Sequence, residues 1–120
     1  GLGVYFPSET VKAAERLVKI FHGKILISDE LSRRDALLLA IYMLSNKKGS
    51  PTVPREDVEK FYTEAGRDVR DKKHTTEFSK ALYDLAKAAK RPLVKRRGDN
   101  LSLTSAGLSR VGGLLAPEEK

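Results

Sequence analysis

Apolar residues recur at helical spacing near the start of the chain, in a stretch bounded by a capping residue and a glycine. Ser8 can cap a helix that runs to about His22, where Gly23 supplies a stop. The repeating apolar positions are Val11, Ala14, Leu17, Val18 and Phe21. Residues 24–28 form too short an apolar run to classify by periodicity, and we interpret them as an extended connector. The pattern predicts a surface helix over residues 8–22 with one apolar face.

A second helix is indicated by Ser32, which can act as its N-cap, with Asp35 at the acidic position of a capping box. This helix is expected to end at about Ser45, before the turn-forming residues 46–51. Residues 36–44 are apolar nearly all round the helix. Such a helix needs cover on more than one side, so we expect it at the centre of the fold.

The segment 52–66 predicts a third helix, with Pro54 in its first turn and Gly66 as its C-cap. The residues expected to face inward from this helix are Val58, Phe61, Tyr62 and Ala65. Residues 67–74 are too charged for a core and are interpreted as a connecting loop.

A fourth helix is predicted from Thr75 or Thr76 to about Ala89, where the following Lys-Arg-Pro stops it. Its apolar side consists of Phe78, Ala81, Leu82, Leu85 and Ala89. At 100° per residue, the opposite side consists of Thr76, Lys80, Tyr83 and Lys87. The outward side of this helix is therefore polar, basic and aromatic.

Two short strand candidates follow, Leu-Val-Lys-Arg and Leu-Ser-Leu, separated by Arg-Gly-Asp-Asn. Gly98 and Asn100 tolerate the positive backbone angles that a tight turn needs, so this segment predicts a β-hairpin. Thr104 can then cap a final short helix, and residues 116–120 are expected to fray. The residues of that helix available to pack are Leu108, Val111, Leu114 and Leu115.

Charge is concentrated where these last elements lie. The 120-residue chain has a net charge of +7, and residues 72–97 alone hold nine Lys or Arg against two acids, a difference of +7. Such a localised basic segment favours a nucleic acid as partner over a merely solvated surface.

The order of three helices, a basic helix, a basic hairpin and a short helix resembles the winged helix-turn-helix superfamily. The resemblance covers about residues 31–111, and many bacterial and archaeal regulators of this superfamily close the second wing strand with Leu-Thr-x-x-Gly. Here Leu103, Thr104 and Gly107 match that motif. We therefore expect a mainly α fold with a small β-hairpin (α+β), a winged helix-turn-helix with an additional N-terminal helix. Residues 1–30 would pack on a winged-helix domain of residues 31–113, followed by a tail of residues 114–120.

The resemblance implies binding of double-stranded DNA, and transcription regulation as the function. Helix 75–89 would enter the major groove, and the wing over residues 93–103 would touch the backbone or minor groove. The DNA-binding residues it implies are Thr75, Thr76, Ser79, Lys80, Tyr83, Lys87, Lys95, Arg96, Arg97 and Asn100. Glu77 and Asp84 flank this side, and would repel phosphate unless they turn away, pair with Lys80 or Lys87, or accept from a cytosine amino group.

Other classes of function find less support in the sequence. It has no Cys and offers no metal cluster, cofactor motif or catalytic dyad, so we expect neither a cofactor nor an enzyme. No apolar run approaches a membrane span, and we expect a cytoplasmic protein, nucleoid-associated if it binds DNA. The alternative function is a protein-interaction or homodimerisation module acting through the helices of residues 8–22 and 33–45.

Overall fold

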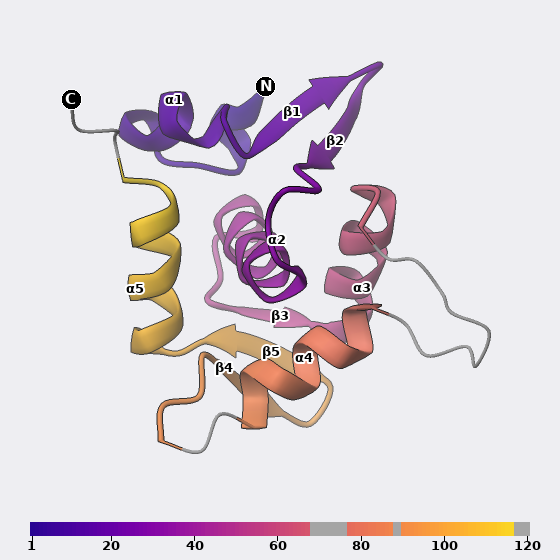
Figure 1. The fold of residues 1–120 in the computed structure, drawn as a ribbon, viewed down its shortest axis with the longest axis vertical. Coiled ribbons are helices and arrows are strands. Elements are labelled where there is room, and N and C mark those ends of the chain that lie inside the picture. Colours follow the sequence, from indigo (N-terminus) through magenta and orange to yellow (C-terminus); the bar gives the residue numbers. More distant parts are fainter. Residues whose placement is uncertain (68–76, 88–89, 117–120) are drawn as a thin grey trace.

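The chain folds around one central helix. The computed structural model describes residues 1–67, 77–87 and 90–116, which form an α+β fold. In Figure 1 the central helix α2 (Arg33–Lys48) is seen nearly end-on, with α3 (Arg55–Glu64) on one side and α5 (Ser105–Leu114) on the other. Helix α4 (Glu77–Lys87) lies below α2 in that view, and the N-terminal segment lies above it.

Helix α2 is capped and buried as its sequence predicts. The Ser32 hydroxyl accepts a hydrogen bond from the Asp35 N–H at 3.1 Å, and the helix ends at Lys48, three residues beyond Ser45, with Gly49 as its C-cap at φ +66°. Its buried residues are Ala36, Leu37, Leu38, Leu39, Ala40, Ile41, Met43 and Leu44. Each buried leucine contributes about 1.5–3 kcal/mol by leaving water. Because α3, α4 and α5 all contact α2, its apolar surface is covered within the chain, which removes the observation that suggested a partner face on residues 33–45.

The expected hairpin is present, and it belongs to a three-stranded antiparallel sheet. Strands β4 (Val94–Arg97) and β5 (Asn100–Leu103) pair with each other, and β3 (Thr52–Pro54) pairs with the other edge of β5. Val53 lies opposite Leu101, and both are buried against the core. Residues 52–54 were expected to begin the third helix, and this expectation was wrong because three residues are too few to reveal a strand pattern.

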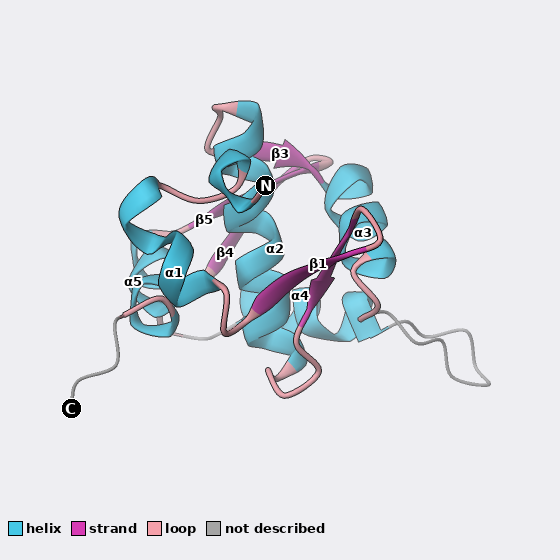
Figure 2. Cartoon of the chain, turned by 90° about the horizontal axis from the view of Figure 1, so that it is seen from above, coloured by secondary structure: helices cyan, strands magenta, loops and turns pink. Residues whose placement is uncertain are grey.

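The predicted helix over residues 8–22 is wrong. The chain begins with a single turn of 3₁₀-helix, η1 (Leu2–Val4), and residues 8–14 form a second such turn, η2 (Ser8–Thr10), and the short helix α1 (Val11–Ala14). Strands β1 (Val18–Phe21) and β2 (Lys24–Ile27) then form an antiparallel hairpin, in place of the helix end and the connector. Figure 2 shows this hairpin beside α3, to which it is joined by a hydrogen bond from the Ile27 N–H to the Ala65 carbonyl.

The turn between these strands explains the difference. His22 and Gly23 are its two central residues, and both have positive φ, 51° and 77°. Two consecutive positive φ angles define the two-residue turn whose twist matches that of antiparallel strands. Gly23 therefore turns a hairpin instead of ending a helix. The β-branched residues Val18, Ile20 and Ile25 on either side suit the pleated strands.

Two single residues also differ from expectation. Arg67, expected in a charged loop, is only 7% exposed and donates to the carbonyls of Ser28 and Leu31 at 3.0 and 2.8 Å. Leu108, expected to pack, is 51% exposed. Residues 68–74, and Ala89 at the end of the predicted fourth helix, lie outside the described residues.

Candidate nucleic-acid interface

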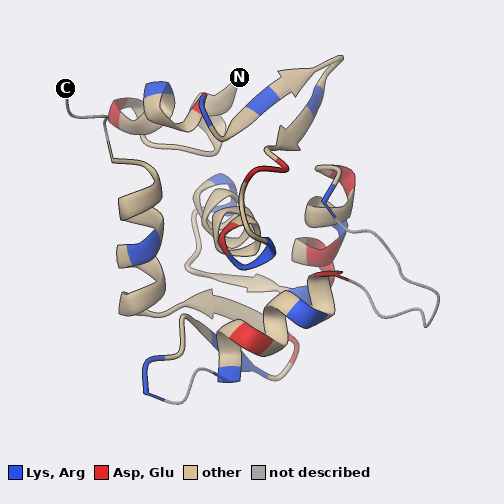
Figure 3. Ribbon diagram, viewed as in Figure 1, with Lys and Arg blue, Asp and Glu red and all other residues tan. Residues whose placement is uncertain are grey.

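One end of the molecule carries most of the predicted site. We define the basic face as the exposed side chains of Lys80, Tyr83 and Lys87 on α4 together with Lys95, Arg96 and Arg97 on β4. Figure 3 shows the Lys residues of α4 at the same end of the molecule as the three-stranded sheet. The N–H of Leu93 donates to the Leu85 carbonyl at 3.0 Å, which holds the start of the hairpin against α4.

Helix α4 places its residues on the sides that the sequence predicts. Phe78, Ala81, Leu82 and Leu85 are buried, and Tyr83 is 54% exposed between Lys80 and Lys87. Ser79 is half-buried. Thr75 and Thr76, also predicted as contact residues, lie outside the described residues.

Lys87 and Tyr83 form one composite group. The Lys87 ammonium donates a hydrogen bond to the Tyr83 hydroxyl and lies 4.6 Å from the centre of the Tyr83 ring. This hydrogen bond raises the pKa of Lys87 above its ordinary value. The pair therefore presents a charged ammonium beside an exposed aromatic ring, which suits contact with a phosphate and a sugar or base.

The two acids of α4 both have partners other than a nucleic acid. Asp84 lies 3.6 Å from Arg33 Nη2, at the start of α2. Glu77 accepts a hydrogen bond from the Tyr62 hydroxyl at 3.1 Å and lies 3.9 Å from Arg67 Nε. Burial, together with the neighbouring Glu77 carboxylate, raises the pKa of Tyr62 above its ordinary value. A cation next to each carboxylate reduces the repulsion that the acids would exert on phosphate.

The hairpin places its three cations on two faces. Side chains alternate along a strand, so Lys95 and Arg97 leave one face of the sheet, and Arg96 leaves the face that carries buried Val94. Gly98 has φ +58° in the two-residue turn, as predicted. Asn100 was expected to share that role, but it is a strand residue paired with Arg97 and Pro54. Asn100 is nevertheless exposed beside the basic residues of β4.

The tip of the hairpin is held close to the body of the protein. The Asp99 carbonyl accepts a hydrogen bond from the Arg55 N–H at 2.7 Å, at the start of α3. The Arg55 guanidinium lies 5.3 Å from the centre of the Phe78 ring on α4. Hairpin, α3 and α4 are therefore connected through Arg55, which fixes the hairpin relative to the exposed side of α4.

The Leu-Thr-x-x-Gly segment has a structural explanation. The Thr104 hydroxyl donates to the Pro92 carbonyl at 2.6 Å and accepts from the Gly107 N–H at 3.1 Å, where it caps α5 as predicted. The Thr104 N–H donates to the Leu93 carbonyl at 3.2 Å. A Cβ atom on Gly107 would lie 2.1 Å from the Leu93 carbonyl oxygen. The motif therefore joins both ends of the hairpin to α5.

Sequence reasoning missed the arginines that surround α4. Arg33 pairs with Asp84, and Arg67 reaches Glu77 from the end of α3. Asp35, expected to complete a capping box, accepts two hydrogen bonds from Arg110 at 3.0 and 2.8 Å. These ion pairs join different parts of the fold, and no local sequence pattern predicts them.

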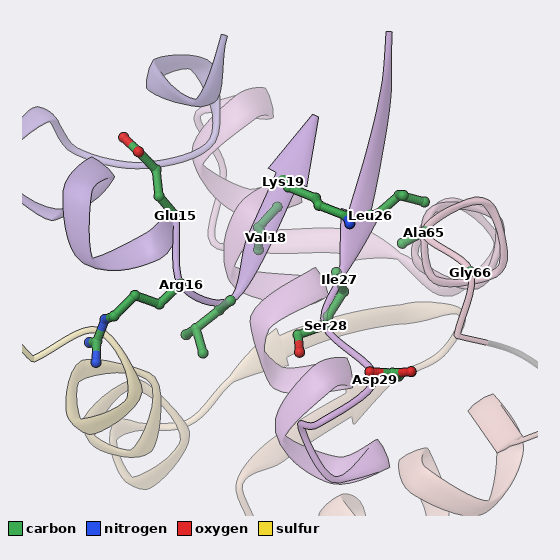
Figure 4. A pocket seen from close by; sticks show the side chains of 11 residues that line it. Glu15, Arg16, Val18, Lys19, Leu26, Ile27, Ser28, Asp29, Ala65 and Gly66 are labelled. Carbon is green, nitrogen blue, oxygen red and sulfur yellow. The ribbon is translucent and has the colours of Figure 1, made fainter. Parts of the chain in front are cut away.

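A cavity of about 380 Å³ lies at the other end of the molecule, between β1, β2 and the end of α3. In Figure 4 the labelled side chains Glu15 and Arg16 point away from Asp29 rather than toward a common centre. Arg16 Nη2 donates to the Ala116 carbonyl at 2.9 Å. The polar groups around this cavity therefore do not converge as those of a small-molecule site do.

The described part of the chain contains no group of three or more His, Cys, Asp or Glu residues placed to hold a metal ion. None of the helices described is long and apolar enough to cross a membrane.

Comparison of the chain with protein-family models, with curated proteins and with solved structures found no match in any of the three.

Proposed function

We propose that this chain is a winged helix-turn-helix domain that binds double-stranded DNA, and that it acts in transcription regulation. Helix α4 would enter the major groove, and the β4–β5 hairpin would be the wing on the backbone or minor groove. The order α2, β3, α3, α4, β4, β5, α5 and the paired strands β3-β5-β4 support this proposal.

The observation that carries the proposal is the basic face. Its five cations are exposed on two adjoining elements, and on α4 the exposed Tyr83 lies between Lys80 and Lys87. Lysine and arginine neutralise phosphates and release the counterions condensed on the duplex, so such a surface binds nucleic acid in a salt-dependent way. Phosphate contact is better supported than base reading, because the outward residues of α4 include no Arg, Asn or Gln.

The proposal is tested by fluorescence anisotropy of a labelled random-sequence duplex, titrated with the protein between about 50 and 200 mM salt. We expect binding that weakens steeply with salt. The double variant Arg96→Ala with Arg97→Ala should bind more weakly and reduce the slope of log affinity against log salt by about 1 per lost phosphate contact.

The matched control is Lys12→Ala with Lys60→Ala, which removes the same charge from exposed positions on α1 and α3. Its binding and salt slope should stay near those of the unaltered protein. Equal losses in the two variants would count against the wing, because net charge alone would then explain them. Absence of binding at the lowest salt would refute the DNA-binding proposal.

A further inference from the structure

The β1–β2 hairpin leaves apolar surface uncovered at the end of the molecule opposite the basic face (Figure 1). Ile20 and Phe21, in the outer half of β1, are 47% and 56% exposed. Beside them is a groove of about 360 Å³. The residues lining it are Leu2, Val11, Glu15, Val18, Lys19 and Ile20. Large exposed apolar residues beside a groove are typical of a surface that contacts another protein.

The backbone of β1 is also open for pairing. The Ser28 N–H donates to the Leu17 carbonyl at 2.8 Å, so the alternation of an antiparallel pair directs the N–H and C=O of Ile20 away from β2. Among the residues described, none hydrogen-bonds to these outward groups of Ile20. The opposite edge of the hairpin differs, because Ile27 on β2 donates to the Ala65 carbonyl. The edge of β1 is therefore less covered than the edge of β2, which lies beside α3.

We infer that this edge pairs with β1 of a second copy of the chain, forming a four-stranded antiparallel sheet across a twofold axis at Ile20. Pairing of β1 with itself in a register that places Val18 opposite Ile20 would set Lys19 opposite the second Lys19. Like charges directly opposite each other destabilise a sheet. The register with Ile20 opposite Ile20 avoids this and sets each Lys19 opposite Phe21 of the second copy, a favourable pairing of a cation with an aromatic ring.

One pair of opposite charges, Lys24 and Glu15, is available along the rest of this pair of strands. In the Ile20 register, Val18 of one copy lies opposite His22 of the other, so each hairpin tip reaches the base of the opposing strand. The tip carries Lys24, and the groove at the base is lined by Glu15. Twofold symmetry makes both contacts twice, as in the self-complementary interfaces of most homodimers. These features favour a second copy as the occupant of the edge.

This inference does not rest on DNA binding. The hairpin and the basic face lie at opposite ends of the molecule, so a dimer formed through β1 leaves the basic face exposed (Figure 1). Dimerisation is therefore measured on the protein alone.

Sedimentation velocity over protein concentrations from about 10 µM to about 1 mM tests the dimer. We expect the mass to rise from 13.3 kDa toward twice that value. Ile20→Lys should keep the protein monomeric through the same range, because it breaks the apolar contact and sets two cations across the axis. The matched control is Leu108→Lys, which replaces another half-exposed apolar residue far from β1 and should dimerise normally.

A cysteine variant tests the register of the paired strands. Its result does not depend on destabilising the protein. The chain has no Cys, so Ile20→Cys introduces a single thiol. Hydrogen-bonded residues of an antiparallel pair have Cα atoms about 5.5 Å apart, within the range that a disulfide spans. Mild oxidation should therefore give a covalent dimer from Ile20→Cys and far less from Phe21→Cys, whose copies lie farther apart.

Two results would overturn the inference. One is a monomer at every concentration with no disulfide-linked dimer from Ile20→Cys. The other is a dimer that Ile20→Lys leaves intact, because association would then use another surface.

Discussion

Gly107 is required by its neighbour and not by its own backbone angle. Its φ is not positive, yet a Cβ atom there would lie 2.1 Å from the carbonyl oxygen of Leu93. Leu93 cannot easily withdraw, because its carbonyl accepts from Thr104 and its N–H donates to Leu85. A single missing methyl group thus lets the hairpin, α4 and α5 meet at one point.

Gly107→Ala should lower the free energy of unfolding by about 1–3 kcal/mol, since backbone must shift to admit the methyl group. Gly112→Ala is the matched control in the same helix, where a Cβ would meet nothing within 4 Å. That variant should raise the free energy of unfolding by about 0.4–1 kcal/mol through the lower entropy of its unfolded chain. Urea denaturation of both variants measures the difference, and equal effects would contradict the contact with Leu93.

Tyr62 makes the free energy of unfolding depend on pH, and one substitution at this position isolates that effect. Burial raises its pKa above the ordinary value of 10.0, so the folded protein keeps the phenol proton after the unfolded chain has begun to release it. Its contribution to stability is therefore complete below pH 10 and is lost as the pH rises from 10 toward the folded pKa.

We expect the free energy of unfolding of the unaltered protein to fall more steeply above pH 10 than that of Tyr62→Phe. Below pH 10 the Tyr62→Phe variant should be less stable by about 1–3 kcal/mol, because the Glu77 carboxylate loses a hydrogen-bond donor. Urea titrations from pH 8 to about pH 11 compare the two slopes. Parallel curves would contradict the assigned role of Tyr62.

At the scale of elements, α4 combines a buried apolar side with an exposed basic side. The negative charge on that exposed side is offset by an ion pair with a residue of another helix. Asp84 is the acid on that exposed side, and Arg33 of α2 is its partner. Because both side chains are partly exposed, the pair contributes little to stability. Its larger effect is on the field that an approaching phosphate meets.

If the basic face binds DNA, Asp84→Asn should tighten binding about 2- to 10-fold at low salt, since it removes a negative charge and releases Arg33. The matched control is Glu9→Gln, which removes the same charge from an exposed position near the N-terminus. Anisotropy with the random duplex compares the two variants. A gain of equal size in both would show that the location of the charge does not matter.

The elements also show which sequence signals are dependable. The central helix, the third helix and the hairpin of residues 94–103 were predicted, because cap, period and turn chemistry agree there. The N-terminal helix was wrong because Val11, Ala14, Val18 and Phe21 fit a helical repeat while Val18–Phe21 also suits a strand. The choice between them depends on pairing with Lys24–Ile27, a contact that a local window does not contain.

At the scale of the whole molecule, the predicted site residues that lie in the described chain are on two adjoining elements, α4 and the β4–β5 hairpin. Periodicity identified the outward side of α4, and turn chemistry identified the adjoining hairpin, so both halves of the basic face were predictable. The supporting arginines were not, because Arg33, Arg55 and Arg67 act through residues distant in sequence. Arg67 also ties the connector after β2 to the start of α4, so residues 1–30 are integrated with the rest of the fold.

The placement of the open β1 edge and the basic face at opposite ends has a consequence for architecture (Figure 1). A regulator that reads two adjacent half-sites on one duplex needs recognition helices about 34 Å apart on the same side of the dimer. A pair of chains joined through β1 would instead turn the two basic faces outward, away from each other. Such a dimer would have two DNA-binding surfaces that face away from each other. It would therefore suit a role in crosslinking two separate segments of duplex.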